Sequence, residues 1–266
     1  MKLLFFGDIV GRAGRQALAK ILPDWKAAYQ PDLVIANVDN LAHGKGVTPR
    51  TLQEIMSLGV DVCTGGDHIF DAPAVNELLD KEQIPLLRPL NYQTPKPGRG
   101  SWRFRVGSRE ILIVHLLGQV FMPEAVRSPF QVIDDCLRLE KSVVPPVAVI
   151  VDFHAEATSE KIALGWHLAG RVTAVLGTHT HVTTADERIL PGGTAYLTDV
   201  GMVGAVNGVI GVKKEGSLRR FLTNELTHLE PLETGLVEVS AVLVEFSSAD
   251  GQARSIERLR AQVEVL

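Results

Sequence analysis

Residues 2–8 read KLLFFGD, a short apolar run that ends at the carboxylate of Asp8. A run without polar alternation is typical of a strand buried on both faces. The same design, an apolar run followed by polar residues, recurs at residues 32–40, 60–68, 147–154 and 172–181. Helical apolar spacing separates the first three of these runs. The sequence therefore predicts a strand–helix–strand series with parallel strands and crossover helices.

The rest of the chain continues this alternation of elements. Strands are expected over residues 2–7, 32–36, 60–64, 102–106, 111–117, 147–153, 172–176, 193–198, 236–246 and 253–259, and helices over 12–29, 49–58, 73–81, 130–143 and 158–168. Thr48 is the expected N-cap of the second helix, with Pro49 at its first position. The last two strands alternate apolar and polar residues, which predicts an antiparallel pair. The proline-rich stretch 85–100 predicts an irregular crossing. Because no boundary or repeat divides the chain, residues 1–266 are expected to form a single domain.

The composition is that of an ordinary globular protein, with 266 residues, 45% of them hydrophobic and 22% charged. The net charge of −4 gives no overall basic excess, so a nucleic acid is a disfavoured partner. Cys63 and Cys136 lie in apolar surroundings and form no CxxC pair, which indicates buried free thiols. No apolar run reaches the roughly 18 residues of a membrane-spanning helix, and the first residues lack the features of a signal peptide. We therefore expect a cytoplasmic protein without a membrane partner, and a homo-oligomer is the ordinary default.

Side chains that can bind metals follow five of the expected strands. They are Asp8, Asp39 with Asn40, Asp67 with His68, His154, and His179 with His181. In open α/β sheets ligands bind at the carboxyl ends of the strands, so residues far apart in the sequence converge there. Carboxylates and imidazoles together hold hard and borderline divalent ions, and the lack of a thiolate argues against a closed structural zinc site. The set predicts a metal site formed by residues far apart in the sequence.

The histidine pair in GTHTH, residues 177–181, is the strongest single signal. His179 and His181 are two positions apart, and residues two apart on a strand point to the same face. Two imidazoles on one face are a frequent metal-binding arrangement. His115, His167 and His228 do not follow a strand in this way and are interpreted as structural or surface residues.

These segments resemble the calcineurin-like metallophosphoesterase superfamily, and more closely its YmdB-like branch of bacterial phosphodiesterases. The resemblance rests on GDIVGRAGR at 7–15, residues 37–40, Gly66-Asp67-His68, VDFHAEATSEKIALGW at 151–166, GTHTHVTTADERILPGGTAYLTDVGM at 177–202, and GVKKE at 211–215. It runs from the first residue to about residue 225, with a weaker tail. It implies an α/β fold, a two-layer β-sandwich of mixed sheets flanked by helices, with a site for two metal ions.

The resemblance also implies a role for each polar residue of the set. Asp8 and His181 would bind the first metal, Asp67, His154 and His179 would bind the second, and Asp39 would bridge the two. Asn40 would hold a phosphate oxygen or lie beside a metal, and His68 would be the catalytic histidine. Iron or manganese is the expected metal, with zinc or magnesium as alternatives. The branch usually has Glu at position 39 and Asn at position 67, so this chain differs at two of its ligands.

The implied activity is in-line hydrolysis of a phosphodiester by a hydroxide that bridges the two metals. His68 is the expected general acid for the leaving oxygen, because imidazole can carry a proton near neutral pH. A 2′,3′-cyclic nucleotide is the expected substrate, with phosphomonoesters and RNA ends as alternatives. Thr178 and Asp199 are candidates for orienting the histidines, and residues 43–46 and Arg99 for contacting the substrate. A second hypothesis is a catalytically weak regulator that binds a nucleotide or a partner protein and keeps a vestigial metal site.

Overall fold

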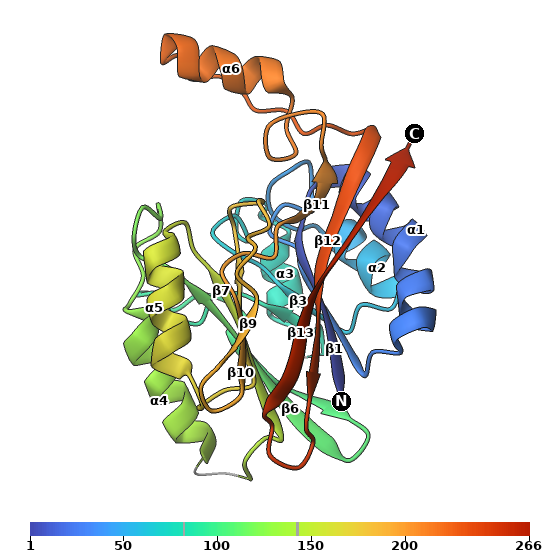
Figure 1. Cartoon of the computed structure of the whole chain (residues 1–266). Helices are drawn as coiled ribbons and strands as arrows, with labels where there is room; N and C mark the ends of the chain where they lie inside the picture. Colours follow the sequence, from blue (N-terminus) through green and yellow to red (C-terminus); the bar gives the residue numbers. More distant parts are fainter. Residues whose placement is uncertain (82, 142–143) are drawn as a thin grey trace.

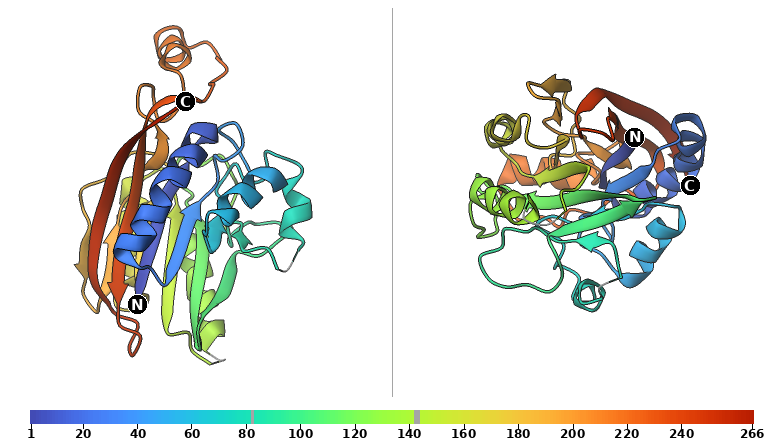
Figure 2. Two further views of the ribbon diagram at one scale, coloured as in Figure 1. Left: turned by 90° about the vertical axis from the view of Figure 1, so that its right-hand side faces the viewer. Right: turned by 90° about the horizontal axis from the view of Figure 1, so that it is seen from below.

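A computed structural model describes residues 1–81, 83–141 and 144–266. Its centre is a pair of mixed β-sheets that pack face to face, with helices on both outer faces (Figure 1, Figure 2). The strands are β1 (Lys2–Ile9), β2 (Leu33–Asn37), β3 (Val62–Thr64), β4 (Leu86–Leu87), β5 (Ser101–Val106), β6 (Arg109–Leu117), β7 (Ala148–His154), β8 (Ala174–Thr178), β9 (Arg188–Leu190), β10 (Thr194–Leu197), β11 (Met202–Ala205), β12 (Gly235–Phe246) and β13 (Ala253–Val265). The helices are α1 (Gly11–Tyr29), α2 (Pro49–Ser57), α3 (Val75–Leu79), α4 (Pro129–Lys141), α5 (Thr158–Leu168) and α6 (Lys214–Thr223). The predicted two-layer sandwich flanked by helices is confirmed.

Both sheets combine parallel and antiparallel strands. The first sheet has the order β13-β12-β11-β1-β2-β3-β4, in which β1 to β4 are parallel and β12 pairs antiparallel with β13. The second sheet has the order β5-β6-β7-β8-β10-β9, with β6, β7, β8 and β10 parallel and an antiparallel strand at each edge. The parallel pairing predicted for the first three strands is confirmed, since β1, β2 and β3 are parallel neighbours. The other parallel strands that end in polar residues, β7 and β8, lie in the second sheet.

Strand β1 shows why residues 2–8 are apolar at nearly every position. Leu4 and Phe6 pack in the core under α1 and α2, whereas Leu3 and Phe5 pack between the two sheets. All four side chains are fully buried. A strand that is covered on both faces needs apolar side chains at odd and even positions. Burying each of them contributes about 1.5–3 kcal/mol to folding.

The helices cover the outer faces and begin largely where the sequence predicts. α4 and α5 pack on the second sheet through Ile133 and Leu164. α2 starts at a reciprocal cap, in which the Thr48 hydroxyl accepts from the N–H of Thr51 (3.3 Å) and the Thr51 hydroxyl accepts from the N–H of Thr48 (3.1 Å). The antiparallel pairing of β12 with β13 and the buried free thiols of Cys63 and Cys136 are also confirmed.

Several elements were not predicted. β4, β9 and β11 are two to four residues long, which is too short for a periodic pattern to show. β4 lies inside the stretch 85–100, which is otherwise irregular as expected. The last two residues of the predicted helix 130–143 lie outside the described residues. Across the three described ranges, no helix is both long and apolar enough to cross a membrane.

Helix α6 lies on an arm, residues 212–231, that projects beyond the edge of the sandwich (Figure 1). The arm leaves and rejoins the body at a narrow neck, where Val212 and Pro231 form an antiparallel bridge. Leu218, Phe221 and Leu222 on α6 are 53%, 78% and 82% exposed. Sequence prediction of a helix relies on the apolar stripe that the helix buries against a core. The apolar side chains of α6 face solvent, so this pattern did not identify the helix.

One crossing segment, residues 198–201, ties the two sheets together at the edge where the parallel strands end. A Cβ atom on Gly7 of β1 would lie 1.9 Å from the carbonyl oxygen of Gly201, and one on Gly177 of β8 would lie 1.7 Å from that of Thr198. Only glycine permits so close a backbone approach. The crossing segment therefore holds the ends of β1 and β8 in fixed positions beside each other.

Candidate metal centre

The polar residues that follow the parallel strands gather at one edge of the sandwich and come from both sheets. The first sheet contributes Asp8 within β1, Asp39 and Asn40 after β2, and Asp67 and His68 after β3, and the second contributes His154 at the end of β7 and His179 and His181 after β8. The carboxyl ends of the parallel strands of both sheets meet there, which brings residues distant in the sequence together. The predicted set is thus present as a spatial cluster.

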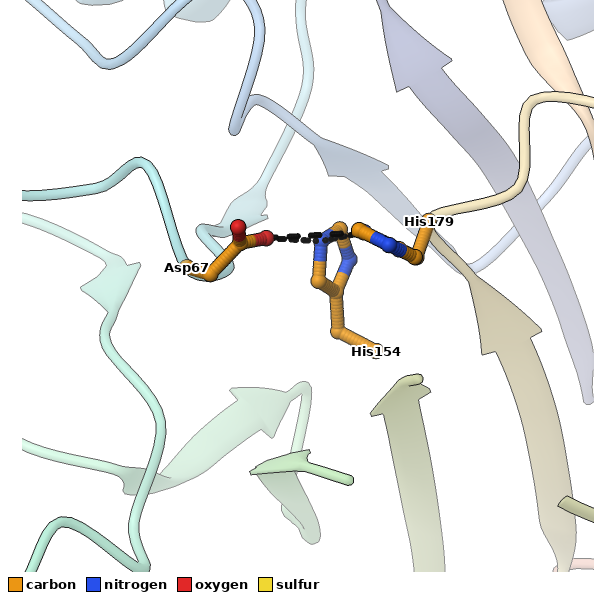
Figure 3. A group of neighbouring side chains, drawn as sticks. All are labelled: Asp67, His154 and His179. Carbon is orange, nitrogen blue, oxygen red and sulfur yellow. Dashed lines mark hydrogen bonds and ion pairs between the residues drawn. The ribbon is translucent and has the colours of Figure 1, made fainter. Parts of the chain in front are cut away.

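Three side chains form a compact group at the centre of this cluster (Figure 3). The Oδ1 atom of Asp67 lies 3.2 Å from Nε2 of His154 and 3.4 Å from Nδ1 of His179. The two ring nitrogens are 3.1 Å apart. One ligand atom from each residue lies within 4.8 Å of the others, a spacing that could hold a metal ion. The group matches the set expected for the second metal.

The hydrogen bonds of His154 identify which ring nitrogen faces this group as an acceptor. The Thr178 hydroxyl donates to Oδ1 of Asp152 (2.8 Å), so its oxygen accepts from Nδ1–H of His154 (2.9 Å). Burial lowers the pKa of His154, which keeps the ring neutral. Its Nε2 lone pair then faces the carboxylate of Asp67. A cation between these two acceptors would satisfy both, and a held Nδ1–H is the usual arrangement of a metal-binding histidine.

Asp8 and Asp39 are fully buried carboxylates, each with one oxygen that lacks a hydrogen-bond partner in the described part of the chain. Their other oxygens accept from backbone N–H groups, Asp8 from His179 (3.0 Å) and Asp39 from His68 (3.1 Å). Burial, and then the charge of Asp67, raise the pKa of Asp39 well above its usual value. A bound cation would offset both effects, so these residues fit a metal site.

A further pair of facing acceptors lies on the other side of the cluster. Nδ1 of His181 lies 3.0 Å from the carbonyl oxygen of Ile210, which can only accept, so Nδ1 carries the hydrogen. Its Nε2 lies 3.1 Å from Oδ1 of Asn40 and 3.8 Å from Oδ1 of Asp8. The Asn40 amide donates to the Gly44 carbonyl (3.0 Å), which keeps Oδ1 turned toward His181. Asp8 and Asn40 therefore each direct an oxygen acceptor toward Nε2 of His181.

The side chain of His68 is 27% exposed, close to the 23% of His179, whereas that of His154 is 1% exposed. Nδ1 of His68 lies 3.0 Å from Oδ2 of Asp71, and its Nε2 lies 3.8 Å from Oδ2 of Asp67. Its ring therefore lies between the carboxylates of Asp67 and Asp71. Ligand atoms of His68, Asp39 and Asp67 also lie within 4.8 Å of one another. The geometry is compatible with a proton donor and with a metal ligand.

The histidines of GTHTH converge for a different reason from the predicted one. β8 ends at Thr178, and His179 and His181 have φ angles of 104° and 63°. They lie in a left-handed turn rather than on an extended strand, so same-face alternation does not apply. Positive φ is strained for residues other than glycine and is common at functional sites.

A buried ion pair supports this strained turn. The Lys161 ammonium donates to Asp199 (2.6 Å) and to the carbonyl of Thr178 (2.8 Å), and Asp199 accepts from the N–H of Thr180 (3.1 Å). Asp199, predicted to orient a histidine, thus contacts the backbone between the two histidines and neither ring. Thr178 does contact a ring, that of His154, as predicted.

Some residues of the site were missed by the sequence analysis. Asp152, which holds Thr178, lies two positions before His154 on β7, and strand alternation could have revealed it. Glu156, 3.2 Å from Nε2 of His179, and the buried Lys161 gave no comparable signal. His115, expected to be structural or at the surface, is fully buried with Nδ1 3.3 Å from Asp152.

Part of the cluster, namely Asp39, Asn40, His68, His179 and His181, lines a cleft with a volume of about 840 Å³. Its lining comprises Val10, Asp39, Asn40, Ala42, His43, Gly44, Lys45, His68, Asp71, Glu156, His179, Thr180, His181, Ile210, Val212, Arg220, Thr227, His228 and Leu229. Most of the predicted substrate loop 43–46 is present, and His228 joins it although it was interpreted as structural or surface. Arg99 is not among the lining residues and stacks instead on Trp102.

Gly66 leaves room for the cluster. A Cβ atom there would lie 2.5 Å from Nε2 of His154 and 2.6 Å from Cγ of Asp39. We therefore expect Gly66→Ala to displace ligands and to lower turnover by about 10²-fold, the effect of a misplacement of about 1 Å. The matched control is Gly65→Ala, whose Cβ would meet only the side chain of Ile69 among its nearest atoms. Steady-state rates and metal content of both variants test this; equal losses would mean general disruption of the turn.

The fold and this arrangement of carboxylates and imidazoles are metallophosphoesterase-like. The family model described as "YmdB-like protein" matches residues 4–259, and the chain belongs to this family. A relative from Bacillus subtilis strain 168, described as a 2′,3′-cyclic-nucleotide 2′-phosphodiesterase, is 39% identical over 260 residues, which is 97% of this chain and 96% of the relative.

Two solved structures extend the comparison. A structure described as a novel phosphatase from Mycoplasma pneumoniae has a TM-score of 0.92 and 36% identity, covering 100% of this chain and 94% of the other. A structure described as a hypothetical protein from Thermus thermophilus has a TM-score of 0.91 and 40% identity, covering 98% of this chain and 99% of the other. The resemblance inferred from the sequence is confirmed, and with it the class of enzyme, a hydrolase of phosphoester bonds.

Proposed function

We propose that this chain is a phosphodiesterase that hydrolyses 2′,3′-cyclic nucleotides with two bound metal ions. The observation that carries the proposal is the set of acceptor atoms that gather where the parallel strands of both sheets end, beside the cleft. Asp8, Asp39, Asp67, His154, His179 and His181 each direct an acceptor atom into one small volume. The substrate class is suggested by the description of the Bacillus subtilis relative.

The residues divide into two ligand groups. Asp67, His154 and His179 would hold one ion, and Asp8, Asn40 and His181 the other. Asp39, whose Oδ2 atom lies 3.6 Å from Nε2 of His154, would bridge them. When bound, such ions supply a nucleophile at neutral pH and neutralise charge on the phosphate oxygens. Iron or manganese is the proposed metal, since both accept this mixture of carboxylate and imidazole ligands.

His68 is proposed as the general acid. The ring lines the cleft and is partly exposed, so it can reach a substrate there, and Oδ2 of Asp71 lies 3.0 Å from its Nδ1. Proton transfer to the departing ribose oxygen would neutralise the charge that develops there. Asn40 lies at the boundary between the acceptor cluster and the open cleft, where an amide can also contact a phosphate oxygen.

Metal content is the first test. Protein purified without chelator is expected to carry about two equivalents of metal per chain. Chelation is expected to abolish hydrolysis of 2′,3′-cyclic adenosine monophosphate, and iron or manganese should restore it. Metal without turnover of any phosphodiester would favour the regulator hypothesis. A chain that takes up no metal on reconstitution would contradict the enzyme.

A further inference from the structure

The catalytic cleft has an uneven distribution of charged side chains. The carboxylates among its lining residues are Asp39, Asp71 and Glu156. Each has an oxygen within 3.6 Å of a ring nitrogen of a histidine in the candidate metal centre. The wall formed by the loop 42–45 and the arm contributes Lys45 and Arg220, together with His43 and His228. No carboxylate is among the residues that this wall contributes. The cleft therefore joins an acidic, metal-binding floor to a basic wall.

Lys45 belongs to a loop whose shape is tied to the metal cluster. The N–H of Gly46 donates to the carbonyl of Asp39 (2.6 Å), and the N–H of Ala42 donates to the carbonyl of Gly46 (2.9 Å). The Asn40 amide donates to Gly44 (3.0 Å). These bonds fix the ammonium-bearing loop directly beside Asp39 and Asn40.

Arg220 reaches the cleft from the arm, and the arm is braced against that same loop. At the neck, the N–H of Lys213 donates to the carbonyl of Glu230 (2.8 Å), and the two side chains form an ion pair. A Cβ on Gly44 would contact the ring of Pro231 at 3.5 Å, so the loop and the base of the arm lie against each other. The two cations are thus held on parts of one supported wall.

Lys45 and Arg220 have no ion-pair partner in the part of the chain that the structure describes. The adjacent Arg219, by contrast, binds Glu225 (2.7 Å). Unpaired cations that line a cleft are suited to an anionic ligand. The scissile phosphate belongs at the metal floor, so these cations are available for a different anion.

We propose that Lys45 and Arg220 bind a second phosphate of the substrate, on the 5′ side of the nucleoside whose 2′,3′-cyclic phosphate is hydrolysed. This inference rests on the proposed function and specifies its substrate class. The second phosphate is either the 5′-phosphomonoester of a mononucleotide or the last phosphodiester of a short oligonucleotide that ends in a cyclic phosphate. The cleft volume lies near the upper end of the roughly 300–1,000 Å³ found for small-ligand sites, which leaves space beyond a single nucleoside.

The test compares kcat/KM for three substrates of the holoenzyme. They are adenosine 2′,3′-cyclic phosphate, the same compound with a 5′-phosphate, and a dinucleotide that ends in a 2′,3′-cyclic phosphate. We expect a preference of about 10-fold or more for a substrate with the second phosphate, the usual scale of a charge-assisted contact. Comparing the phosphorylated mononucleotide with the dinucleotide shows whether the second phosphate is a 5′-phosphomonoester or a phosphodiester. The preference is the ratio of kcat/KM with the second phosphate to kcat/KM without it. We expect Arg220→Ala and Lys45→Ala each to lower this ratio toward 1, whereas the control Arg219→Ala should leave the ratio unchanged.

The outcomes separate the two proposals. Turnover of all three substrates with equal kcat/KM would overturn the second-phosphate site and leave the phosphodiesterase standing. If Arg219→Ala and Arg220→Ala weaken the preference equally, the second-phosphate site is also overturned. The preference would then come from the overall positive charge of the arm rather than from a contact with Arg220. If no cyclic nucleotide is hydrolysed while bis(p-nitrophenyl) phosphate is, the proposed substrate class fails and the second-phosphate site fails with it.

Discussion

Asp39→Asn is expected to lower metal content from about two equivalents to about one or fewer and to reduce turnover by about 10³-fold or more. Asparagine keeps the size of the side chain but removes the charge that a bridging ligand shares between two cations. Oδ1 of Asp39 is buried and has no hydrogen-bond partner in the described part of the chain, so the carboxylate is available as a ligand there. The several kcal/mol of transition-state stabilisation that metal ions supply would be lost with them.

The control for this variant is Asp39→Glu, which keeps the charge on a side chain one methylene longer. We expect it to retain metal and much of the activity. Elemental analysis and circular dichroism of both variants separate loss of metal from loss of fold. Full metal occupancy in Asp39→Asn would refute the bridging role.

His68→Ala is expected to lower turnover by about 10²–10⁴-fold while both metals stay bound, as befits the loss of a general acid. The ring is partly exposed beside the cluster, and its removal leaves the acceptors of His154, His179 and His181 in place. The loss should depend on the leaving group. A p-nitrophenolate leaves without a proton, so hydrolysis of bis(p-nitrophenyl) phosphate should suffer much less than that of a cyclic nucleotide.

This dependence separates acid catalysis from metal binding, which the proximity of His68 to Asp39 and Asp67 also allows. A variant that loses metal and is equally impaired on both substrates would make His68 a ligand. Asp71→Asn is a useful companion, because Asp71 contacts Nδ1 of His68 without belonging to either proposed ligand group. It should weaken turnover in the same leaving-group-dependent manner.

The sandwich could be predicted in outline because its strands are long and buried on both faces. The run at residues 2–8 has apolar side chains at both odd and even positions. In the structure, the two faces of β1 pack into two different hydrophobic cores. Its partners could not be predicted, since an apolar strand fits either of two sheets equally well. β11 escaped because four residues show no period, and α6 because its apolar face is unburied.

Much of the candidate site was visible for a simple reason, that polar side chains follow the carboxyl ends of parallel strands. The details depend on tertiary contacts that leave no local pattern. The positive φ of His179 and His181 is maintained by Lys161 and Asp199, which lie on distant elements. Lys161 in particular resembles any exposed helical lysine until the fold buries it.

The acceptors of the proposed centre belong to two sheets, Asp8 and Asp39 to one and His154 and His179 to the other. Ions bound between these residues would crosslink the two sheets at this edge of the sandwich. A ligand that binds only the folded chain at 100 times its dissociation constant adds about 2.7 kcal/mol of stability. By reciprocity, any strain that spreads the sheets weakens the hold on the ions. Metal starvation would then cost this protein mechanical cohesion as well as activity.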